Sequence, residues 1–311
     1  MRKITRFCVA LLAALALHAA SADDRRVFAQ VFLTHWGMST DKPVPADYTG
    51  DRQAEIAVFR PSESNWYIKD FAPSPPTAYH VGWGLASDVL VPADYDGDGK
   101  ADVAVYRPDD GHYRILQSSN NTPRIVQIGV SGDIAVPGDY DGDGKADVAV
   151  WRPGNGNWLI LQSSNGLLRT HQWGLSTDQT VQADYDGDGK TDIAVWRPSE
   201  GNWYIIGSTS GGRVKGWGAS TDKLVPGDYD GDFKADIAVF RPSEGNWYIL
   251  QSATNTVRLV NWGDTINLGD VLVPADYNGD CITDITVWRP SEGTWYSIQS
   301  ENGPCQETDP L

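Results

Sequence analysis

The sequence predicts an all-β fold, a six-bladed β-propeller in which each blade contains four strands. Three observations support this prediction: an acidic heptapeptide that recurs six times, aromatic residues that recur in register with it, and an unpaired strand pattern near the N-terminus. The six acidic loops start at residues 47, 94, 139, 184, 228 and 276 and are therefore 44 to 48 residues apart. A fixed period of this length is typical of a repeat architecture built from one supersecondary unit per repeat.

The fourth repeat shows the composition of one blade. Residues 192–196 (DIAVW) are apolar on both faces and partly β-branched, which predicts a strand covered on both sides. After the turn sequence PSEG, residues 202–206 (NWYII) predict a second, aromatic-rich strand. A Gly/Ser loop leads to a third strand that ends at Trp217, and residues 180–185 supply the fourth, innermost strand before the acidic loop. Four short strands in one repeat of this length match a propeller blade.

Three aromatic positions recur along the repeats, with one exception. One precedes an Arg-Pro pair, one opens the next strand, and one precedes a glycine. We expect these side chains to form the core between blades, and the alternative is that a few of those near the hairpins form a platform for sugar rings. The three sets are Phe59, Tyr106, Trp151, Trp196, Phe240 and Trp288; Trp66, Tyr113, Trp158, Trp203, Trp247 and Trp295; and Trp36, Trp83, Trp173, Trp217 and Trp262, with Ile128 as the exception.

The two ends of the chain predict how the ring closes. The last repeat has an acidic loop and two strands, to about residue 300, but no third strand that ends in an aromatic residue and glycine. Residues 26–37 (RVFAQVFLTHWG) match that missing strand. Pairing of residues 27–36 with the last blade would cover its open edge and complete six blades. An open β-solenoid, the alternative, would leave both ends unpaired.

The N-terminus predicts export. Residues 1–22 have a basic start, an apolar run too short to span a membrane, and a small-residue cleavage site before Asp23, as in a secretory signal peptide. Residues 23–311 are then one propeller domain, which we expect to be secreted, extracellular or periplasmic, and monomeric. Cys281 and Cys305 remain in this mature chain, and an even pair in an oxidising compartment favours a disulfide.

The charge is negative and concentrated in the repeats. The formal net charge is −16, and 22 of the 41 acidic residues lie in the six loops. A nucleic-acid partner would require a basic face, so this class of partner is excluded. No other apolar stretch of the sequence is long enough to predict a membrane span.

The acidic loops predict calcium sites. In the second copy, DYDGDGKAD, carboxylates occupy positions 1, 3, 5 and 9, and glycine occupies position 6. Calcium takes six to eight oxygen ligands, which closely spaced carboxylates and a backbone carbonyl at position 7 can supply. Glycine can adopt the positive φ that lets the chain wrap around an ion. Val105 stands at position 12, where an EF-hand has glutamate, so we expect a strand–loop–strand site and not an EF-hand.

The pattern Asp-x-Asp-x-Asp-Gly-x-x-Asp followed by an apolar strand resembles the FG-GAP/VCBS-type repeat, found in the integrin α-chain propeller and in fungal propeller lectins. The resemblance covers residues 27–300 and implies a propeller with about three to five bound Ca²⁺ ions, each in the loop between the innermost and second strands of a blade. The implied ligands are Asp94, Asp96, Asp98, Lys100 and Asp102; Asp139, Asp141, Asp143, Lys145 and Asp147; Asp184, Asp186, Asp188, Lys190 and Asp192; Asp228, Asp230, Asp232, Lys234 and Asp236; and Asp276, Asn278, Asp280 and Asp284.

Three loops depart from this pattern. Phe233 replaces the position-6 glycine of the fifth loop, which puts its geometry in question. The sixth loop has Asn278 at position 3 and Cys281 at position 6, and we expect it to bind more weakly. The first loop has Thr49, Arg52 and Glu55 at positions 3, 6 and 9, and we expect it to be metal-free.

A second repeated set lies on the face that we expect opposite the acidic loops. It contains an arginine and an aspartate in each repeat, with glutamates beside several of the arginines. Six Arg–Asp pairs that tie the loops together are one interpretation, and a repeated contact to a sugar, an anion or another ligand is the other. The residues are Arg60, Arg107, Arg152, Arg197, Arg241 and Arg289; Asp41, Asp88, Asp133, Asp178, Asp222 and Asp270; and Glu63, Glu200, Glu244 and Glu292.

No catalytic grouping emerges from the sequence. The mature chain has four histidines, His35, His80, His112 and His171, at inconsistent places in the repeats. No serine–histidine–acid or phosphate-loop pattern is present, although the many carboxylates are compatible with a glycosidase. We therefore expect an extracellular binding or adhesion module for a glycan or protein. The alternatives are a propeller-type lyase or hydrolase that degrades polysaccharide, and a purely structural surface protein.

Overall fold

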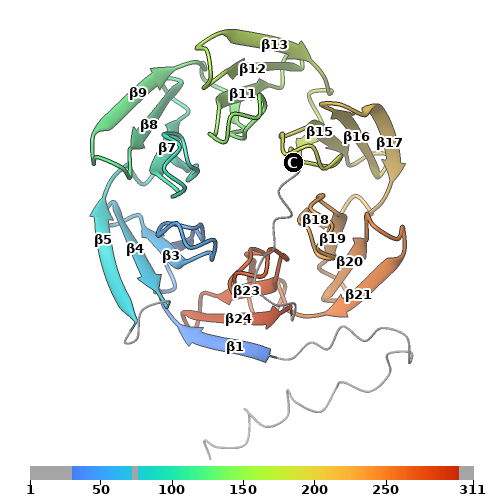
Figure 1. The fold of residues 1–311 in the computed structure, drawn as a ribbon. Helices are drawn as coiled ribbons and strands as arrows, with labels where there is room; N and C mark the ends of the chain where they lie inside the picture. Colours follow the sequence, from blue (N-terminus) through green and yellow to red (C-terminus); the bar gives the residue numbers. More distant parts are fainter. Residues whose placement is uncertain (1–29, 72–75, 301–311) are drawn as a thin grey trace, which may run out of the picture.

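The computed structural model describes residues 30–71 and 76–300. These residues form six four-stranded antiparallel sheets arranged around a central axis as the blades of a propeller (Figure 1). The described residues contain no helix, so the structure offers no helical segment that could cross a membrane. The fold class predicted from the repeats is confirmed.

Each blade runs outward from a two-residue innermost strand. Blade 1 contains β2 (Lys42–Pro43), β3 (Ile56–Arg60), β4 (Asn65–Asp70) and β5 (Thr77–Gly82). Blade 2 contains β6 (Val89–Leu90), β7 (Val103–Arg107), β8 (His112–Leu116) and β9 (Pro123–Gln127). Blade 3 contains β10 (Ile134–Ala135), β11 (Val148–Arg152), β12 (Asn157–Leu161) and β13 (Leu168–Gln172).

The other three blades repeat this order. Blade 4 contains β14 (Gln179–Thr180), β15 (Ile193–Arg197), β16 (Asn202–Gly207) and β17 (Gly211–Gly216). Blade 5 contains β18 (Lys223–Leu224), β19 (Ile237–Arg241), β20 (Asn246–Leu250) and β21 (Val257–Asn261). Blade 6 contains β22 (Val271–Leu272), β23 (Ile285–Arg289), β24 (Thr294–Gln299) and, from the start of the chain, β1 (Gln30–His35).

The ring closes in the way that the unpaired strand pattern near the N-terminus predicts. Strand β1 pairs antiparallel with β24 along its whole length, from Gln30 opposite Gln299 to His35 opposite Thr294. This pairing supplies the outermost strand of blade 6 and covers an edge that would otherwise expose unpaired backbone groups. The ring is therefore joined by hydrogen bonds between the two ends of the chain (Figure 1).

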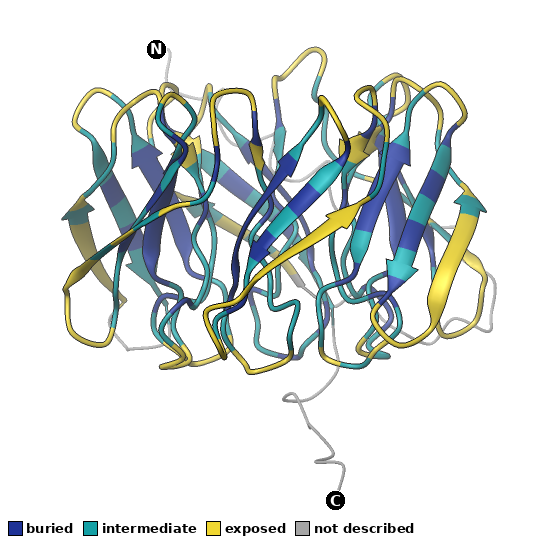
Figure 2. Cartoon of the chain, turned by 90° about the horizontal axis from the view of Figure 1, so that it is seen from above, coloured by how far each residue is buried: buried dark blue, intermediate teal, exposed yellow. Residues whose placement is uncertain are grey.

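The core lies between blades. Six apolar clusters each combine side chains from two neighbouring blades, as when Tyr106 and Tyr113 of blade 2 pack with Val148 and Val150 of blade 3. The second and third strands are buried while the outermost strands are mostly exposed (Figure 2). The aromatics of the first two sets are 0–1% exposed. They are core residues, so they cannot form an exposed platform for sugars.

Tryptophans of the third set join neighbouring blades. The indole of Trp36 donates to the carbonyl of Tyr67 in blade 1 (3.1 Å), and Trp83, Trp173, Trp217 and Trp262 make the corresponding bond across the next junctions. Blade 2 has Ile128 at this position, and the Tyr113 hydroxyl bonds Ala149 of blade 3 instead (2.5 Å). Every junction thus combines apolar packing with a polar contact to a backbone carbonyl.

Candidate metal centres

The six acidic loops lie at one end of the blades, between the innermost strand and the second strand. A short bridge closes each loop at its base, as between Ala93 and Asp102 in blade 2. The position-1 carboxylate organises the loop, because Asp94 accepts hydrogen bonds from the amides of Gly97 (2.6 Å) and Gly99 (2.8 Å). Both glycines have positive φ, +82° and +83°, which a tight wrap of this kind requires.

The position-9 carboxylate joins the acidic loop to a second loop of the same blade. Asp102 is fully buried, and it accepts hydrogen bonds from the amides of Tyr95 (3.0 Å) and Ser118 (2.7 Å). Ser118 belongs to the turn between β8 and β9, and its hydroxyl bonds Asp98 (2.9 Å) while the hydroxyl of Ser119 bonds Asp96 (2.7 Å). The turn therefore covers the acidic loop and fixes three of its carboxylates.

These serines were not predicted as part of the site. A serine follows the position-9 aspartate by 16 residues in five repeats, and its amide bonds that aspartate each time. The recurring segments QSSN, QSSN, GSTS, QSAT and QSEN carried this signal in the sequence. The five serines are Ser118, Ser163, Ser208, Ser252 and Ser300.

Five loops bring three carboxylates together closely enough to hold one ion. In each group the oxygens lie within 4.8 Å of one another. The groups are Asp47, Asp51 and Glu55; Asp94, Asp96 and Asp102; Asp139, Asp141 and Asp147; Asp184, Asp186 and Asp192; and Asp228, Asp230 and Asp232. Among the described residues, the sixth loop does not bring three of its carboxylates together in this way.

An unsatisfied oxygen distinguishes the position-3 aspartates. The Oδ1 atoms of Asp96, Asp141 and Asp186 are buried and have no hydrogen-bond partner among the residues that the structure describes. Leaving a charged oxygen in this state costs several times a net hydrogen bond, so such groups in native proteins require an explanation such as an ion. A hard cation inside the loop would satisfy each oxygen, and these residues therefore fit a calcium ion.

Burial perturbs the position-9 carboxylates. It raises the pKa of Asp192 to about 6 and the pKa values of Asp236 and Asp284 to about 7, although hydrogen bonds from neighbouring amides act in the opposite direction. Nearby aspartates of the same loop raise these pKa values further. The loops thus hold carboxylates whose negative charge is costly unless a cation compensates it.

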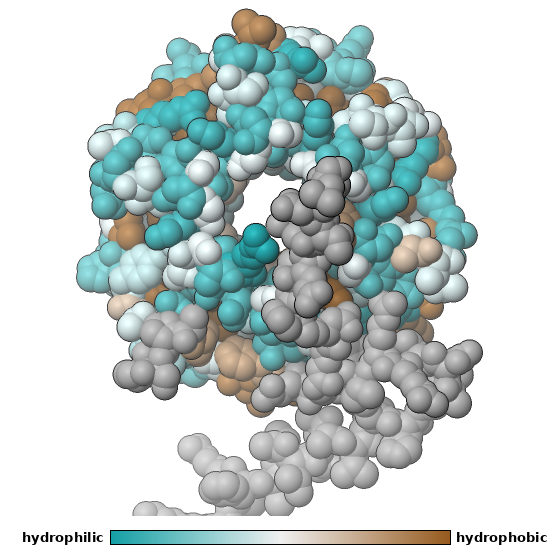
Figure 3. Space-filling view, in the orientation of Figure 1, coloured by the Kyte–Doolittle hydropathy of each residue, from teal (hydrophilic) through white to brown (hydrophobic). Residues whose placement is uncertain are grey.

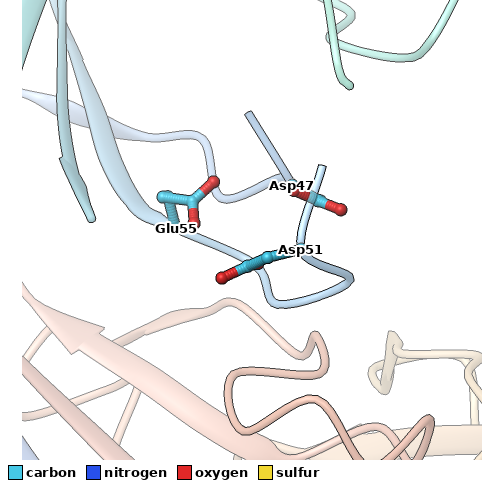
Figure 4. Close-up of side chains that lie close together, drawn as sticks. All are labelled: Asp47, Asp51 and Glu55. Atoms are coloured by element: carbon cyan, nitrogen blue, oxygen red, sulfur yellow. The ribbon is translucent and has the colours of Figure 1, made fainter. Parts of the chain in front are cut away.

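Loop 1 has the same backbone with different chemistry at position 3. Asp47 accepts from the amides of Gly50 (2.6 Å) and Arg52 (2.8 Å), as its counterparts do in the other loops. Thr49 replaces the position-3 aspartate, and its hydroxyl donates to Glu55 (3.2 Å). Figure 4 shows the carboxylates of Asp47, Asp51 and Glu55 around the loop. Burial raises the pKa of Glu55 to about 7.

The departures at position 6 do not disturb the loops. Arg52, Phe233 and Cys281 all adopt positive φ, between +63° and +69°, in the place of glycine. The amide of Phe233 bonds Asp228 at 2.8 Å, the same contact that Gly99 makes in loop 2. The backbone of loop 5 therefore matches that of loop 2 at this position, although the carboxylates that loop 5 brings together include position 5 and not position 9. Cys305 lies outside the described residues, so the Cys281–Cys305 disulfide stays a prediction.

Neighbouring acidic loops are joined in a circle. The position-8 amide of each loop donates to the position-1 carbonyl of the preceding loop, at 2.6–2.7 Å. The lysine at position 7 also packs over the position-4 glycine of the preceding loop, as Lys145 does over Gly97. The loops surround the opening visible at the centre of the ring (Figure 3). The donors are Ala54, Ala101, Ala146, Thr191, Ala235 and Thr283.

An arginine on the outermost strand supports the acidic loop in three blades. Arg213 donates to the carbonyl of Tyr185 (2.9 Å), and Arg124 and Arg258 make the corresponding bond to Tyr95 and Tyr229 (3.4 and 3.0 Å). Strand register places Arg169 at the same position in blade 3, whereas blades 1 and 6 have Tyr79 and Phe32 there. The arginine therefore occurs in the four blades with aspartate at loop position 3.

At the other end of the blades, the repeated arginines form bidentate pairs with the repeated aspartates. Arg197, for example, bonds both oxygens of Asp178 at 2.9 and 3.0 Å. The guanidinium also lies 4.3 Å from the ring centroid of Tyr204, whose hydroxyl bonds Glu200. The six pairs are Arg60–Asp41, Arg107–Asp88, Arg152–Asp133, Arg197–Asp178, Arg241–Asp222 and Arg289–Asp270.

These contacts confirm the interpretation of the arginines as structural ties. The aspartate side chains of the six pairs are 0–2% exposed, while the arginine side chains keep 14–32% exposure. Glu63, Glu200, Glu244 and Glu292 each accept a hydrogen bond from a tyrosine hydroxyl. The network satisfies the polar groups of this face internally, and the arginine edges remain partly accessible to solvent.

Comparison with known proteins agrees with the repeat and the fold. A family model for the FG-GAP-like repeat matches residues 47–105 and 139–195. The chain thus carries FG-GAP-like repeats, and they are arranged as a six-bladed β-propeller. No curated protein matches the sequence.

Several solved structures share the fold at low sequence identity. A lectin of Agrocybe aegerita, described for its recognition of non-reducing terminal N-acetylglucosamine, matches with a TM-score of 0.54 and 16% identity over 87% of this chain and 82% of the lectin chain. A chain from the complex of BBS1N with ARL6DN matches with a TM-score of 0.53 and 10% identity, covering 89% of this chain and 97% of that one. Virginiamycin B lyase from Staphylococcus aureus matches with a TM-score of 0.50 and 9% identity, covering 86% and 99%.

Proposed function

We propose that this protein is an exported, calcium-stabilised propeller that binds an extracellular glycan or protein. The proposed calcium binding rests on one observation. Asp96, Asp141 and Asp186 each have a buried, unsatisfied carboxylate oxygen and each belong to a group of three carboxylates. Calcium prefers carboxylate and carbonyl oxygens on a flexible loop, and these loops offer both. Loops 2 to 5 are the proposed sites, loop 6 a weaker one, and loop 1 remains metal-free.

The binding part of the proposal rests on the fold and on the surface. A lectin is among the distant structural matches, which makes glycans the first ligands to test, but a shared fold does not itself determine function. Six similar blades repeat the same polar face six times, which suits a ligand bound at several weak sites. The ion would act by holding the loops and blades in place and not by contacting the ligand.

A calcium titration tests the metal sites. Isothermal titration calorimetry of the EDTA-stripped and dialysed protein should show about four sites, with dissociation constants in the range of extracellular modules, about 10⁻⁴–10⁻³ M. Magnesium should compete poorly, because it demands a smaller and more rigid octahedral site. The absence of heat or of saturation at millimolar calcium would remove the metal from the proposal.

A glycan array tests the binding function separately. The protein should bind a restricted set of glycans in millimolar calcium, and binding should fall in EDTA as the blades loosen. A turnover assay on each bound glycan distinguishes a binding module from a lyase or hydrolase. Cleavage of a bound glycan would replace the proposed function with the enzymatic alternative.

A further inference from the structure

The junction between blades 4 and 5 contains a cleft of about 350 Å³ beside acidic loop 4. It lies between β17 on one side and the β20–β21 connection on the other, two elements that are neighbours in the ring (Figure 1). Its walls include Arg213, Lys215 and Lys234, together with the apolar side chain of Leu250 and the amide of Asn255. A volume of this size is at the lower end of ligand pockets and suits one small molecule.

Lys215 is a departure from the repeat. Three other blades have valine at the corresponding place two residues before the third aromatic, and those valines pack into the core between blades. They are Val81, Val126 and Val260. At the blade 4–5 junction the apolar cluster contains no side chain from this position. The substitution replaces an apolar contact between blades with a flexible cation that lines a cleft.

The cations of the cleft are not neutralised by protein carboxylates. Arg213 donates through Nη2 to the Tyr185 carbonyl, and Lys215 lies 3.4 Å from the side-chain oxygen of Asn255. Neither residue, nor Lys234, forms an ion pair with any residue in the described part of the chain. The carboxylate that lines the cleft, Asp186, belongs to acidic loop 4: its Oδ2 accepts hydrogen bonds from the amides of Thr209 and Ser210, and its Oδ1 is the oxygen assigned to the proposed calcium ion.

We propose that this cleft binds a small ligand that carries an oxyanion, a carboxylate or a sulfate. The guanidinium of Arg213 is held by one nitrogen and keeps its remaining donors for the fork-shaped contact that such anions accept. Lys215 and Lys234 add charge, while Ser252 and Asn255 supply polar partners and Leu250 an apolar wall. An acidic sugar residue combines these properties. If the ligand is such a sugar, the inference rests on the proposed glycan binding; for any other oxyanion it does not.

The test compares matched ligands on the whole protein in millimolar calcium. Isothermal titration calorimetry would use methyl glucuronide, glucose 6-sulfate, inorganic sulfate and the neutral methyl glucoside. The glucuronide and the sulfate ester should bind at least about tenfold more tightly than the glucoside, because only they carry the oxyanion. Equal binding by inorganic sulfate would support the oxyanion site and identify the free ion as its source. Equal binding of glucuronide and glucoside, or no binding by any of the anions, would overturn the proposal.

Variants locate the site. Lys215→Val restores the residue that three other blades carry, so the fold should survive, and Lys215→Gln keeps a polar side chain of similar reach. Both should weaken binding of the glucuronide at least about fivefold, because one of three cations is lost. Lys223→Val removes one exposed charge from β18 and serves as the matched control with unchanged affinity. Unchanged affinity in both Lys215 variants would contradict the assignment.

The same measurements separate this inference from the proposed function. If a glycan from the array binds but the Lys215 variants bind it equally well, the cleft is not the site and the binding function stands. If calcium does not bind while the cleft variants lose the anion, the metal proposal fails and the oxyanion site stands. Chemical-shift perturbation confined to β17 and the β20–β21 connection would confirm the place of binding.

Discussion

The acidic loop of blade 1 and that of blade 3 have the same backbone but different charge. Both are organised by a position-1 aspartate that accepts amide hydrogen bonds, three in blade 1 and two in blade 3, and both are closed by a buried acid at position 9. In blade 1 the hydroxyl of Thr49 bonds Glu55, whereas in blade 3 the Asp141 carboxylate keeps one oxygen without a partner. The loop therefore adopts this backbone without a carboxylate at position 3. In blade 3 one oxygen of Asp141 accepts hydrogen bonds from Ser164, and the other is the oxygen that the proposed calcium ion would satisfy.

The largest expected effect that tests this difference is removal of calcium. Four proposed sites at millimolar calcium should together contribute about 4 kcal/mol. For a chain of this size that corresponds to a decrease in melting temperature of roughly 10 °C when EDTA replaces calcium. Thermal melts followed by circular dichroism at fixed ionic strength would measure it. Superimposable curves would mean that blades 1 and 3 do not differ in metal binding.

A smaller effect should follow from a change at position 3 of a single loop. Asp141→Asn should lower the free energy of unfolding in calcium by about 1 kcal/mol, because one calcium site is weakened. In EDTA the same variant should be at least as stable as the parent, since an unsatisfied charge is removed. Thr49→Val in loop 1 is the control, because its effect should be the same with and without calcium. If calcium changed the stability of the Asp141→Asn and Thr49→Val variants equally, the proposed difference between loops 3 and 1 would be wrong.

Glu55 predicts a contribution of loop 1 to the pH dependence of stability, and a variant of this residue separates it from the contributions of the other loops. Burial raises the pKa of this carboxyl from 4.5 to about 7, so the folded state holds the proton more tightly than the unfolded chain does. Its contribution to stability is complete below about pH 4.5 and is lost as the pH rises to about 7. Glu55→Gln should therefore lose fewer degrees of melting temperature than the parent across this range. A steeper loss in the variant would contradict the assignment, and the exposed neighbour Asp51→Asn serves as control.

The smallest expected effect concerns the arginine that supports the loop in blade 2. Arg124→Met removes the bond to the Tyr95 carbonyl and should cost about 0.5–1 kcal/mol. Arg169 occupies the same strand position in blade 3 but makes no hydrogen bond to the described residues, so Arg169→Met is the matched control. Urea denaturation of the two variants in calcium would compare them. Equal stability would show that the arginine does not support the loop.

The fold was predictable from the sequence because its signals are repeated. Six acidic loops, the aromatic positions and the N-terminal strand pattern specify the number of blades and the closure by β1, and the structure confirms both. The Arg–Asp pairs could also be anticipated from their constant offset. A feature that occurs six times in register is visible without coordinates, because chance does not reproduce it.

The remaining features depend on contacts that no local pattern describes. The serine after the third strand of the blade was present in five repeats, but only the turn geometry shows that it bonds the position-9 aspartate. Phe233 and Cys281 stand where loops 2 to 4 have glycine, yet they adopt positive φ, and the position-1 carboxylate of each loop accepts a hydrogen bond from their own amides. The cleft at Lys215 required the structure, since one cation among exposed strand residues carries no signal of its own.

The circle of hydrogen bonds between acidic loops has a mechanical consequence. An open stack of repeats can fray from either end, one unit at a time, because each terminal unit has a single neighbour. Here each blade has two neighbours. The seam beside β1 is held by the pairing of β1 with β24, by the Trp36 indole on the Tyr67 carbonyl and by the amide of Ala54 on the Asp276 carbonyl. A blade can therefore separate from the ring only if its contacts with both neighbouring blades break. The ring should therefore unfold cooperatively. It should stay folded until the contacts at the seam break, and all six blades should then unfold together.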